Sequence, residues 1–211
     1  FNWGIIMAWT AFNNSISIKG RNSSNSIDKF FVNNSTGLNL NDLSVGDNEN
    51  ISGVYKYLGE FYGYSAQQAF LAYQSYLIDF DEDSNTFFSI AKYNNGVDQN
   101  YNVESNGVNT KYNFNVALQL KDNFYFGLNI NTHNVFIDNY VRYTENNFDS
   151  DSAITSINFE NSLLTKGEGF SIQLGAIAKI NSIRVGIAYQ SPTWYTMQDE
   201  TYQFLEAVSY T

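Results

Sequence analysis

The chain has 211 residues and a formal net charge of −10. Nucleic-acid binding is therefore not expected, because it requires clusters of lysine and arginine that neutralise phosphates. The absence of cysteine excludes disulfides, thiol catalysis and cysteine-ligated metals. Charged residues make up only 15% of the chain and aromatic residues 17%, whereas soluble domains typically carry ~25% charged residues. This composition suits a protein with one surface in lipid, and the length predicts one domain over 1–211.

The first predicted strand covers residues 2–20. From Trp3 to Trp9, large apolar side chains stand at every second position and mostly alternate with small or polar ones. Because successive side chains of a strand point to opposite faces, this segment predicts a strand with one apolar face.

Residues 21–108 predict a long loop region that contains a helix near 65–79. Ser65 can cap the helix, and Phe70, Tyr73 and Leu77 recur at helical spacing. Two shorter helices are predicted at 27–33 and 52–61.

The apolar stripe of the predicted helix has two interpretations. It packs the long loop onto the barrel rim, or it forms part of a groove that captures hydrophobic ligands, since such sites are mostly apolar with few polar groups. The second interpretation makes these the candidate ligand-binding residues: Phe70, Leu71, Tyr73, Leu77 and Ile78.

The acidic segment that follows begins like a calcium-binding loop, with Asp79, Asp81 and Asp83. It lacks the glycine and the glutamate that complete such a loop, because Ser84 and Ile90 occupy those positions. A solvated acidic loop and an extracellular cation site are the two interpretations.

Residues 109–120 and 124–144 predict a hairpin closed by a turn at 121–123. Large apolar side chains occupy the even positions of 112–130, and mostly amides, alanine and glycine occupy the odd ones. Strands predicted at 169–180 and 183–190 show the same alternation, and residues 201–211 begin a sixth strand. Each of the five main strands supplies the ~9–11 residues that a tilted transmembrane strand needs.

The polar face distinguishes two fold classes. In a soluble β-sandwich this face would meet bulk water and carry many charges, but here it carries mainly amides, serine, glycine and alanine. Tight turns also alternate with long connections, which is typical of outer-membrane barrels. We therefore predict an all-β fold, part of a transmembrane antiparallel β-barrel of which this chain supplies about five to six strands, with long, partly helical extracellular loops. A soluble β-sandwich is the alternative.

No constellation of catalytic residues is visible, so neither enzyme activity nor a cofactor is expected. His133 is the only histidine and is predicted to be a hydrogen-bonded lumen residue, with a catalytic, metal-binding or haem-ligating role as the alternative. Lys179 and Arg184 fall on the polar phase, where they meet either a ligand carboxylate or ordinary ion-pair partners.

The segment GEGFSIQLGAIAKINSIRVGIAYQSPTWY, residues 167–195, resembles the FadL/TodX family of outer-membrane transporters for hydrophobic compounds. The matching positions are Gly167, Gly169, Gly175, Lys179, Arg184, Gly186, Tyr189, Ser191 and Pro192. Ala178 stands where the family usually has tyrosine. Residues 63–78 resemble the helical third-loop region of homologues from Bacteroidota, and the resemblance extends over 40–211.

The resemblance implies a fourteen-stranded barrel that is plugged by an N-terminal hatch. In that family, ligand enters through an apolar groove between long loops and leaves sideways into the membrane. Because the chain opens at Phe1 without a leader or a hatch, we expect a fragment of such a barrel.

The expected function is passive uptake of long-chain fatty acids or other hydrophobic small molecules through the outer membrane of a Gram-negative bacterium. The expected partners are outer-membrane lipid and a hydrophobic ligand. The alternative is a barrel of the same type that acts as a protein-binding scaffold or shuttle, with other outer-membrane or secretion proteins as partners.

Overall fold

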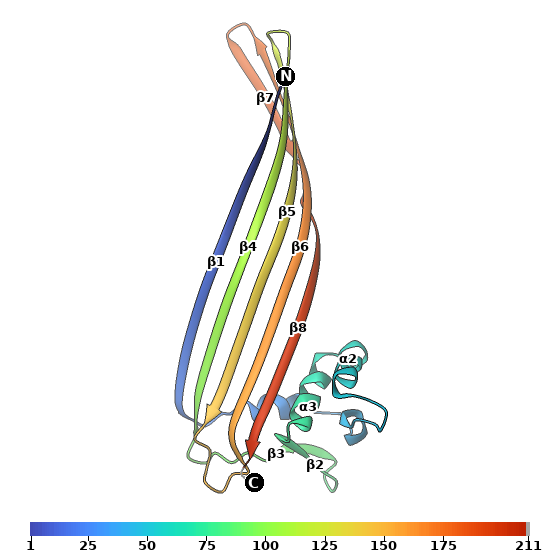
Figure 1. Cartoon of the computed structure of the whole chain (residues 1–211), viewed down its shortest axis with the longest axis vertical. Helices are drawn as coiled ribbons and strands as arrows, with labels where there is room; N and C mark the ends of the chain where they lie inside the picture. The colour runs from blue at the N-terminus through green and yellow to red at the C-terminus, as the bar shows by residue number, and fades with distance from the viewer. Residues whose placement is uncertain (210–211) are drawn as a thin grey trace. The chain divides into compact units, whose positions relative to one another are not determined.

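The computed structural model describes residues 1–209, which form mainly antiparallel strands (Figure 1). By their contacts the residues divide into two compact units. Unit 1 comprises 1–15, 104–140 and 162–202, and unit 2 comprises 16–103, 141–161 and the residues from 203 onward. Five long strands contribute residues to both units.

The principal sheet has six strands in the order β1–β4–β5–β6–β7, and β8 also pairs with β6. The strands are β1 Asn2–Ser23, β4 Val97–Leu120, β5 Phe124–Asn146, β6 Ile154–Ile180, β7 Ile183–Gln190 and β8 Trp194–Ser209. This architecture confirms the all-β prediction. Within the described part of unit 1 there is no second sheet, so the two packed layers of a β-sandwich are not found there.

Several strands are longer than predicted. β4 begins at Val97 instead of 109, and β6 begins at Ile154 instead of 169. Many of the added residues are polar, and cross-strand pairing holds them, as in the hydrogen bond from Ser105 Oγ to Asn139 Oδ1 (2.5 Å). Strand formation depends on such neighbours more than on intrinsic preference, so the predicted connections at 21–108 and 145–167 shrink to 24–96 and 147–153.

β7 and β8 both lie along β6 and are separated by residues 191–193. Pro192 has no N–H to donate to a ladder, and Ser191 anchors the break through two bonds with Ile172. The Ser191 N–H donates to the Ile172 carbonyl, and the Ile172 N–H donates to Ser191 Oγ, both at 2.9 Å. β8 is thus the sixth strand that was predicted at 201–211, although it begins earlier and residues 210–211 lie outside the described residues.

The helices of unit 2 are α1 Asp28–Asn34, the 3₁₀ helix η1 Leu40–Leu43, α2 Ile51–Phe61 and α3 Tyr64–Gln74. Asn50 caps α2 by accepting a hydrogen bond from the Gly53 N–H at 2.8 Å. The prediction that Ser65 caps α3 is wrong, because the N-cap is Gly63, whose φ of 85° is readily adopted only by glycine.

α3 also ends earlier than the predicted residue 79. Tyr76, with a φ of 57°, leaves the helical conformation, and the next residues form β2 Ile78–Asp81, which pairs with β3 Thr86–Ser89. Phe80 lies opposite Phe87 in this hairpin. The cross-strand aromatic contact, at a centroid distance of 4.9 Å, favours the strand over a further helical turn.

The core of unit 2 lies between these helices, the β2–β3 hairpin and the unit 2 ends of β6 and β8. Its largest apolar members are Phe31, Leu43, Leu58, Phe70, Leu77, Ile78, Phe87, Ile154, Ile157 and Leu205. Burying each such side chain contributes ~1.5–3 kcal/mol, so this core holds the helical segment in place.

Candidate functional site: the two faces of the unit 1 sheet

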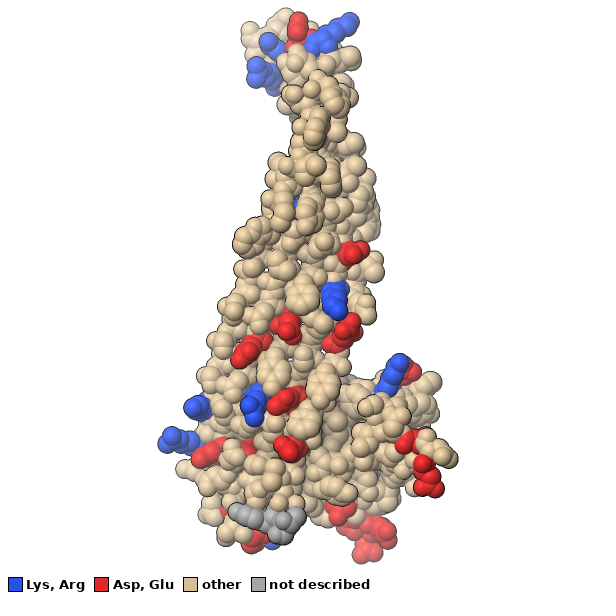
Figure 2. All heavy atoms as spheres, in the orientation of Figure 1, with Lys and Arg blue, Asp and Glu red and all other residues tan. Residues whose placement is uncertain are grey.

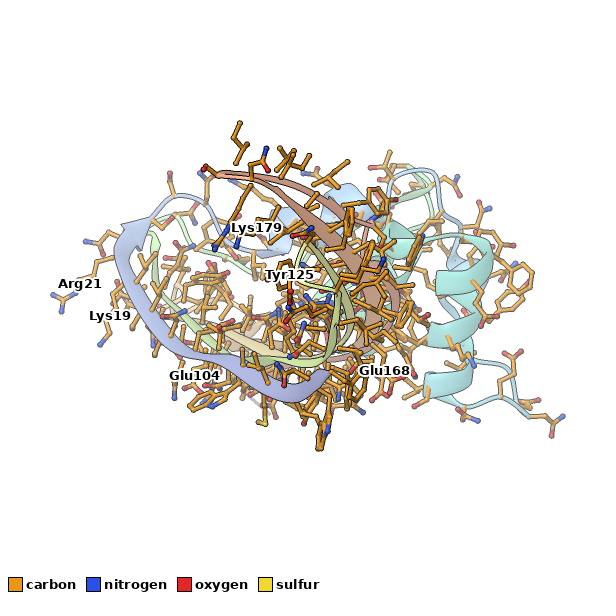
Figure 3. The ribbon with its side chains drawn as sticks, turned by 90° about the horizontal axis from the view of Figure 1, so that it is seen from above. Lys19, Arg21, Glu104, Tyr125, Glu168 and Lys179 are labelled. Carbon is orange, nitrogen blue, oxygen red and sulfur yellow. The ribbon has the colours of Figure 1, made fainter. Side chains whose placement is uncertain are left out.

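The sheet of unit 1 is curled, so that it has a concave and a convex face. Seen from above, Tyr125 and Lys179 point to the concave side, whereas Glu104 and Glu168 lie on the convex side (Figure 3). Tyr125 and Lys179 occupy odd-numbered positions of their strands, whereas Glu104 and Glu168 occupy even-numbered ones. The alternation that was predicted from the sequence therefore separates these two faces.

The convex face is apolar and uncovered. Phe114 is 45% exposed, Leu118 48% and Val185 57%, which is unusual for a soluble domain because large contiguous apolar surfaces are normally buried or bound. One shallow groove of about 440 Å³ crosses this face, lined by the residues Val116, Leu118, Phe126, Gly127, Leu128, Leu174, Gly175, Ala176, Ile187 and Tyr189.

A band free of formal charge runs across the unit 1 strands. The segments 1–15, 112–120, 124–137, 169–178 and 185–198 contain no Lys, Arg, Asp or Glu. The band appears in Figure 2 as an almost entirely tan surface below the charged cluster at the upper tip. Each of these segments has at least the ~9 residues that a tilted strand needs to cross a bilayer, and 185–198 combines most of β7 with the start of β8.

The concave face carries a ladder of amides that spans four strands. Asn113 Nδ2 on β4 donates to Asn131 Oδ1 on β5 (2.6 Å), and Asn131 Nδ2 donates to Ser171 Oγ on β6 (3.3 Å). Asn131 is 0% exposed and Ser171 1% exposed. Buried polar groups are costly unless they are hydrogen-bonded, and this row satisfies them with one another.

A parallel row of amides lies next to it. Asn129 Nδ2 donates to Gln173 Oε1, and Gln173 Nε2 donates to Gln190 Oε1 on β7, both at 3.0 Å. The predicted amide-rich face is therefore a cross-linked network, and it offers hydrogen-bonding groups without formal charge.

Glycines on the concave face admit bulky neighbours. A Cβ on Gly169 would lie 2.5 Å from Cε1 of Tyr195, and a Cβ on Gly167 would collide with Met197. Both glycines belong to the motif that resembles the FadL/TodX family. Their physical role here is to let side chains of β8 lie against the main chain of β6.

His133 also lies beside Tyr195, with a ring-centroid distance of 5.7 Å. Its Nε2 is buried and has no hydrogen-bond partner, so the predicted lumen hydrogen bond is not present at that atom. Within residues 1–209 no group of three or more His, Asp or Glu side chains is arranged to hold a metal ion.

Nearer the hairpin turns the concave face loses its amides. Ala117, Gly127, Gly175 and Ala188 replace them with side chains no larger than a methyl group. A hollow of about 460 Å³ results, whose lining residues are Ala117, Tyr125, Phe126, Gly127, Gly175, Ala176, Ile177, Gly186, Ile187 and Ala188.

Lys179 and Arg184 lie beyond this hollow, directly opposite each other on β6 and β7. Both are exposed, and within residues 1–209 neither forms an ion pair. Like charges directly opposite in a sheet are destabilising, so this pair is a favourable place for an anionic group. The structure thus brings together two of the predicted site residues.

The other predicted site residues lie in unit 2. Phe70 and Leu77 are 0% exposed and Ile78 is 2% exposed, and Leu71 and Tyr73 pack against the same core. This geometry matches the interpretation in which the stripe packs the loop. Tyr73 and Ile78 also line a hollow of about 260 Å³.

The acidic segment forms the β2–β3 hairpin and its turn. Asp81 accepts hydrogen bonds from the Asp83 N–H (3.1 Å) and from Ser84 Oγ (2.8 Å). The Ser84 bond, followed by the Asp83 bond, lowers the pKa of Asp81. Hydrogen bonds within the turn therefore hold the Asp81 carboxylate in place.

Unit 2 contains a buried carboxylate that was not predicted from the sequence. Glu145 is 0% exposed and accepts hydrogen bonds from Ser26 Oγ, the Ile27 N–H, Gln99 Nε2 and Tyr143 Oη, at 2.5–3.0 Å. Burial raises the pKa of the Tyr143 phenol, and the hydrogen bond to Glu145 raises it further. No local pattern marks this residue, because three of these four donors come from two distant segments.

Comparisons with known proteins give no relative. No family model, curated protein or solved structure matches the chain. Among residues 1–209, no helix combines the length and apolar character needed to cross a membrane. Any functional assignment therefore rests on the geometry of the two faces.

Proposed function

We propose that unit 1 forms part of the wall of a transmembrane β-barrel in the outer membrane of a Gram-negative bacterium. We further propose that the barrel passes long-chain fatty acids or similar hydrophobic small molecules without chemistry or cofactor. The observation that carries the proposal is the charge-free band, with an uncovered apolar convex face and a cross-linked amide network on its concave face.

The energetics of a bilayer support this assignment. An Arg or Lys facing lipid at the bilayer midplane costs ~2–4 kcal/mol, and the band carries no such residue. Leu118, Leu174 and Ile187 would face acyl chains there. The amides on the opposite face would meet water in the lumen, where their remaining hydrogen-bonding capacity is satisfied.

The concave face also offers a place for an amphiphilic ligand. The hollow beside Tyr125 and Ile177 would accept part of an acyl chain, because its lining is almost entirely apolar. Lys179 and Arg184 would bind the carboxylate through charge-assisted hydrogen bonds, which also relieves their mutual repulsion. The resemblance of 167–192 to the FadL/TodX motif supports the same class of ligand.

We also propose that the segment 64–80 captures the ligand, but through fewer residues than the sequence suggested. Phe70 and Leu77 are enclosed in the core and Ile78 is only 2% exposed, so Tyr73, which lines a hollow, is the predicted contact. Substituting Phe70 or Leu77 would disrupt the fold of unit 2 and would not test ligand capture.

Uptake of a radiolabelled long-chain fatty acid tests the proposal. The chain would be expressed as part of the complete barrel in a Gram-negative host that lacks its own fatty-acid channel. We expect uptake above the vector control, and a roughly tenfold reduction in the Lys179→Glu/Arg184→Glu variant, which corresponds to ~1.4 kcal/mol. Uptake of a neutral alcohol of the same chain length should change little.

The matched control is Lys19→Glu/Arg21→Glu, a second lysine and arginine pair on an exposed strand segment. Protein in the outer-membrane fraction must be equal in all samples. Uptake no higher than in the vector control would remove the transport proposal. An equal loss in both double variants would remove the role of Lys179 and Arg184.

A further inference from the structure

Helix α2 of unit 2 presents aromatic side chains to solvent. Tyr57 is 51% exposed, Phe61 69% and Tyr62 53%. The ring of Tyr57 lies 4.7 Å from that of Phe61 and 6.1 Å from that of Tyr62, measured between centroids. A contiguous exposed aromatic surface of this kind commonly marks a binding site.

The aromatic surface forms one wall of a pocket of about 490 Å³, which lies within the ~300–1,000 Å³ range of small-molecule sites. Val54 and Leu58, both buried in the core, form the apolar base. The opposite side is polar and comes from η1 and the segment before α2, through the residues Asn41, Asp42, Ser44, Glu49 and Asn50.

Local hydrogen bonds hold three of these polar side chains in place. Asp42 Oδ2 accepts from the Asn39 N–H at 2.8 Å, and Glu49 Oε2 accepts from the Gly46 N–H at 3.0 Å. Asn50 Oδ1 accepts from the Gly53 N–H at 2.8 Å. Each bond uses one atom, and leaves Asp42 Oδ1, Glu49 Oε1 and Asn50 Nδ2 for a ligand.

We propose that this pocket binds a neutral carbohydrate. A pyranose ring has an apolar C–H face, which stacks on an aromatic side chain such as Tyr57 or Tyr62, and a rim of hydroxyls. Those hydroxyls donate to carboxylate oxygens and accept from an amide N–H. The pocket supplies both halves of this recognition, with aromatic rings on one side and oriented acceptors and donors on the other.

Other ligand classes fit the pocket less well. An anionic sugar or a fatty-acid carboxylate would lie next to Asp42 and Glu49, whose negative charges would repel it. A purely apolar ligand would displace the water that hydrogen-bonds to these carboxylates and would offer no hydrogen bonds in its place, which is costly. The proposal is independent of transport through unit 1.

Saturation-transfer NMR on the full chain in a sugar-free zwitterionic detergent tests the proposal. The probes are glucose, galactose, mannose, N-acetylglucosamine and their neutral disaccharides, at ~10 mM because single-site sugar affinities near 1 mM correspond to only ~4 kcal/mol. We expect transfer to the ring C–H protons of at least one neutral sugar. Glucuronate should bind at least tenfold more weakly than glucose.

The variant Tyr57→Ala/Tyr62→Ala should weaken binding of that sugar at least tenfold, while Tyr202→Ala, an exposed tyrosine that does not line the pocket, should leave it unchanged. Circular dichroism of each variant must match the unsubstituted protein. Asp42→Asn supplies a second test that keeps the aromatic wall and should also weaken binding. Absence of transfer to every neutral sugar, or undiminished transfer in the double tyrosine variant, would overturn the proposal.

Discussion

Gly169 has no side chain because Tyr195 occupies that space. A Cβ at this position would lie 2.5 Å from Tyr195 Cε1, well inside van der Waals contact, so the tyrosine ring or the strand has to move. The sequence alone gives no physical reason for a glycine at this position, because the contact is with a residue 26 positions away on β8.

We predict that Gly169→Ala destabilises the protein by ~1–3 kcal/mol, the usual cost of overpacking. The measurement is the midpoint of urea-induced unfolding in detergent micelles. Gly127→Ala is the matched control, because it is a glycine of the same sheet with nothing within 4 Å of its Cβ position. Equal midpoints for the two variants would show that the Tyr195 contact carries no constraint.

His133 shows what a single residue leaves undetermined. The sequence places it on the polar phase, which is correct for its strand position, yet a hydrogen bond depends on what lies across the sheet. The neighbouring ring is Tyr195, and the buried Nε2 has no partner. Parity along the strand predicts which way a side chain points, but not which atoms it meets.

At the scale of the strand, alternation carries most of the information. Leu118 and Gln119 are adjacent on β4, near one end of the charge-free segment 112–120, and they occupy opposite faces of the sheet. If the convex face meets lipid, the free-energy cost of introducing an arginine must differ strongly between these two positions.

We predict that Leu118→Arg slows or prevents folding of the protein into phospholipid vesicles and destabilises the inserted state by ~1–2 kcal/mol, less than the ~2–4 kcal/mol expected at the bilayer midplane. Gln119→Arg should cost much less, because its charge would reach the lumen. The measurement is the fraction of inserted protein as a function of urea. Equal tolerance of both arginines would contradict a lipid-facing convex surface.

Element boundaries were predicted less well than element types. The segment 64–78 contains a helix, as its periodicity indicates, but the chain leaves that helix at Gln74. Ile78 and Phe80 then pair with Ser89 and Phe87. The burial of Ile78 and Phe80 depends on the partner strand. The helical spacing of Phe70, Tyr73 and Leu77 therefore could not reveal where the helix ends.

At the scale of the whole molecule, Glu145 connects segments that are far apart in the chain. It receives hydrogen bonds from Ser26 and Ile27 after β1, from Gln99 on β4 and from Tyr143 on β5. A buried carboxylate with this many donors fixes where the helical segment of unit 2 leaves the sheet.

We predict that Glu145→Ala destabilises unit 2 by ~2–4 kcal/mol, because several buried donors lose their acceptor at ~1–3 kcal/mol each. Limited proteolysis should then cut within residues 24–28 at a protease concentration that leaves the unsubstituted protein intact. Glu104→Ala, which removes an exposed carboxylate, is the control. Unchanged cleavage in Glu145→Ala would show that the apolar core alone holds the segment.

The edges of the principal sheet bear on how the whole molecule functions. Within residues 1–209, β1 and the β7–β8 side are not joined to each other. Unpaired backbone groups are prohibitively costly in the hydrocarbon of a bilayer. If the sheet lies in a membrane, as we propose, further strands must pair with both edges.

Local chemistry in the chain was enough to predict alternating strands, two tight turns and the helices, because each depends on the spacing of neighbouring residues. The tertiary structure alone revealed which face is concave, that Lys179 stands opposite Arg184, and that Phe70 is enclosed while Tyr57 is exposed. The burial of Phe70 and the exposure of Tyr57 depend on side chains brought together from distant segments, and periodicity along one segment contains no information about its partners.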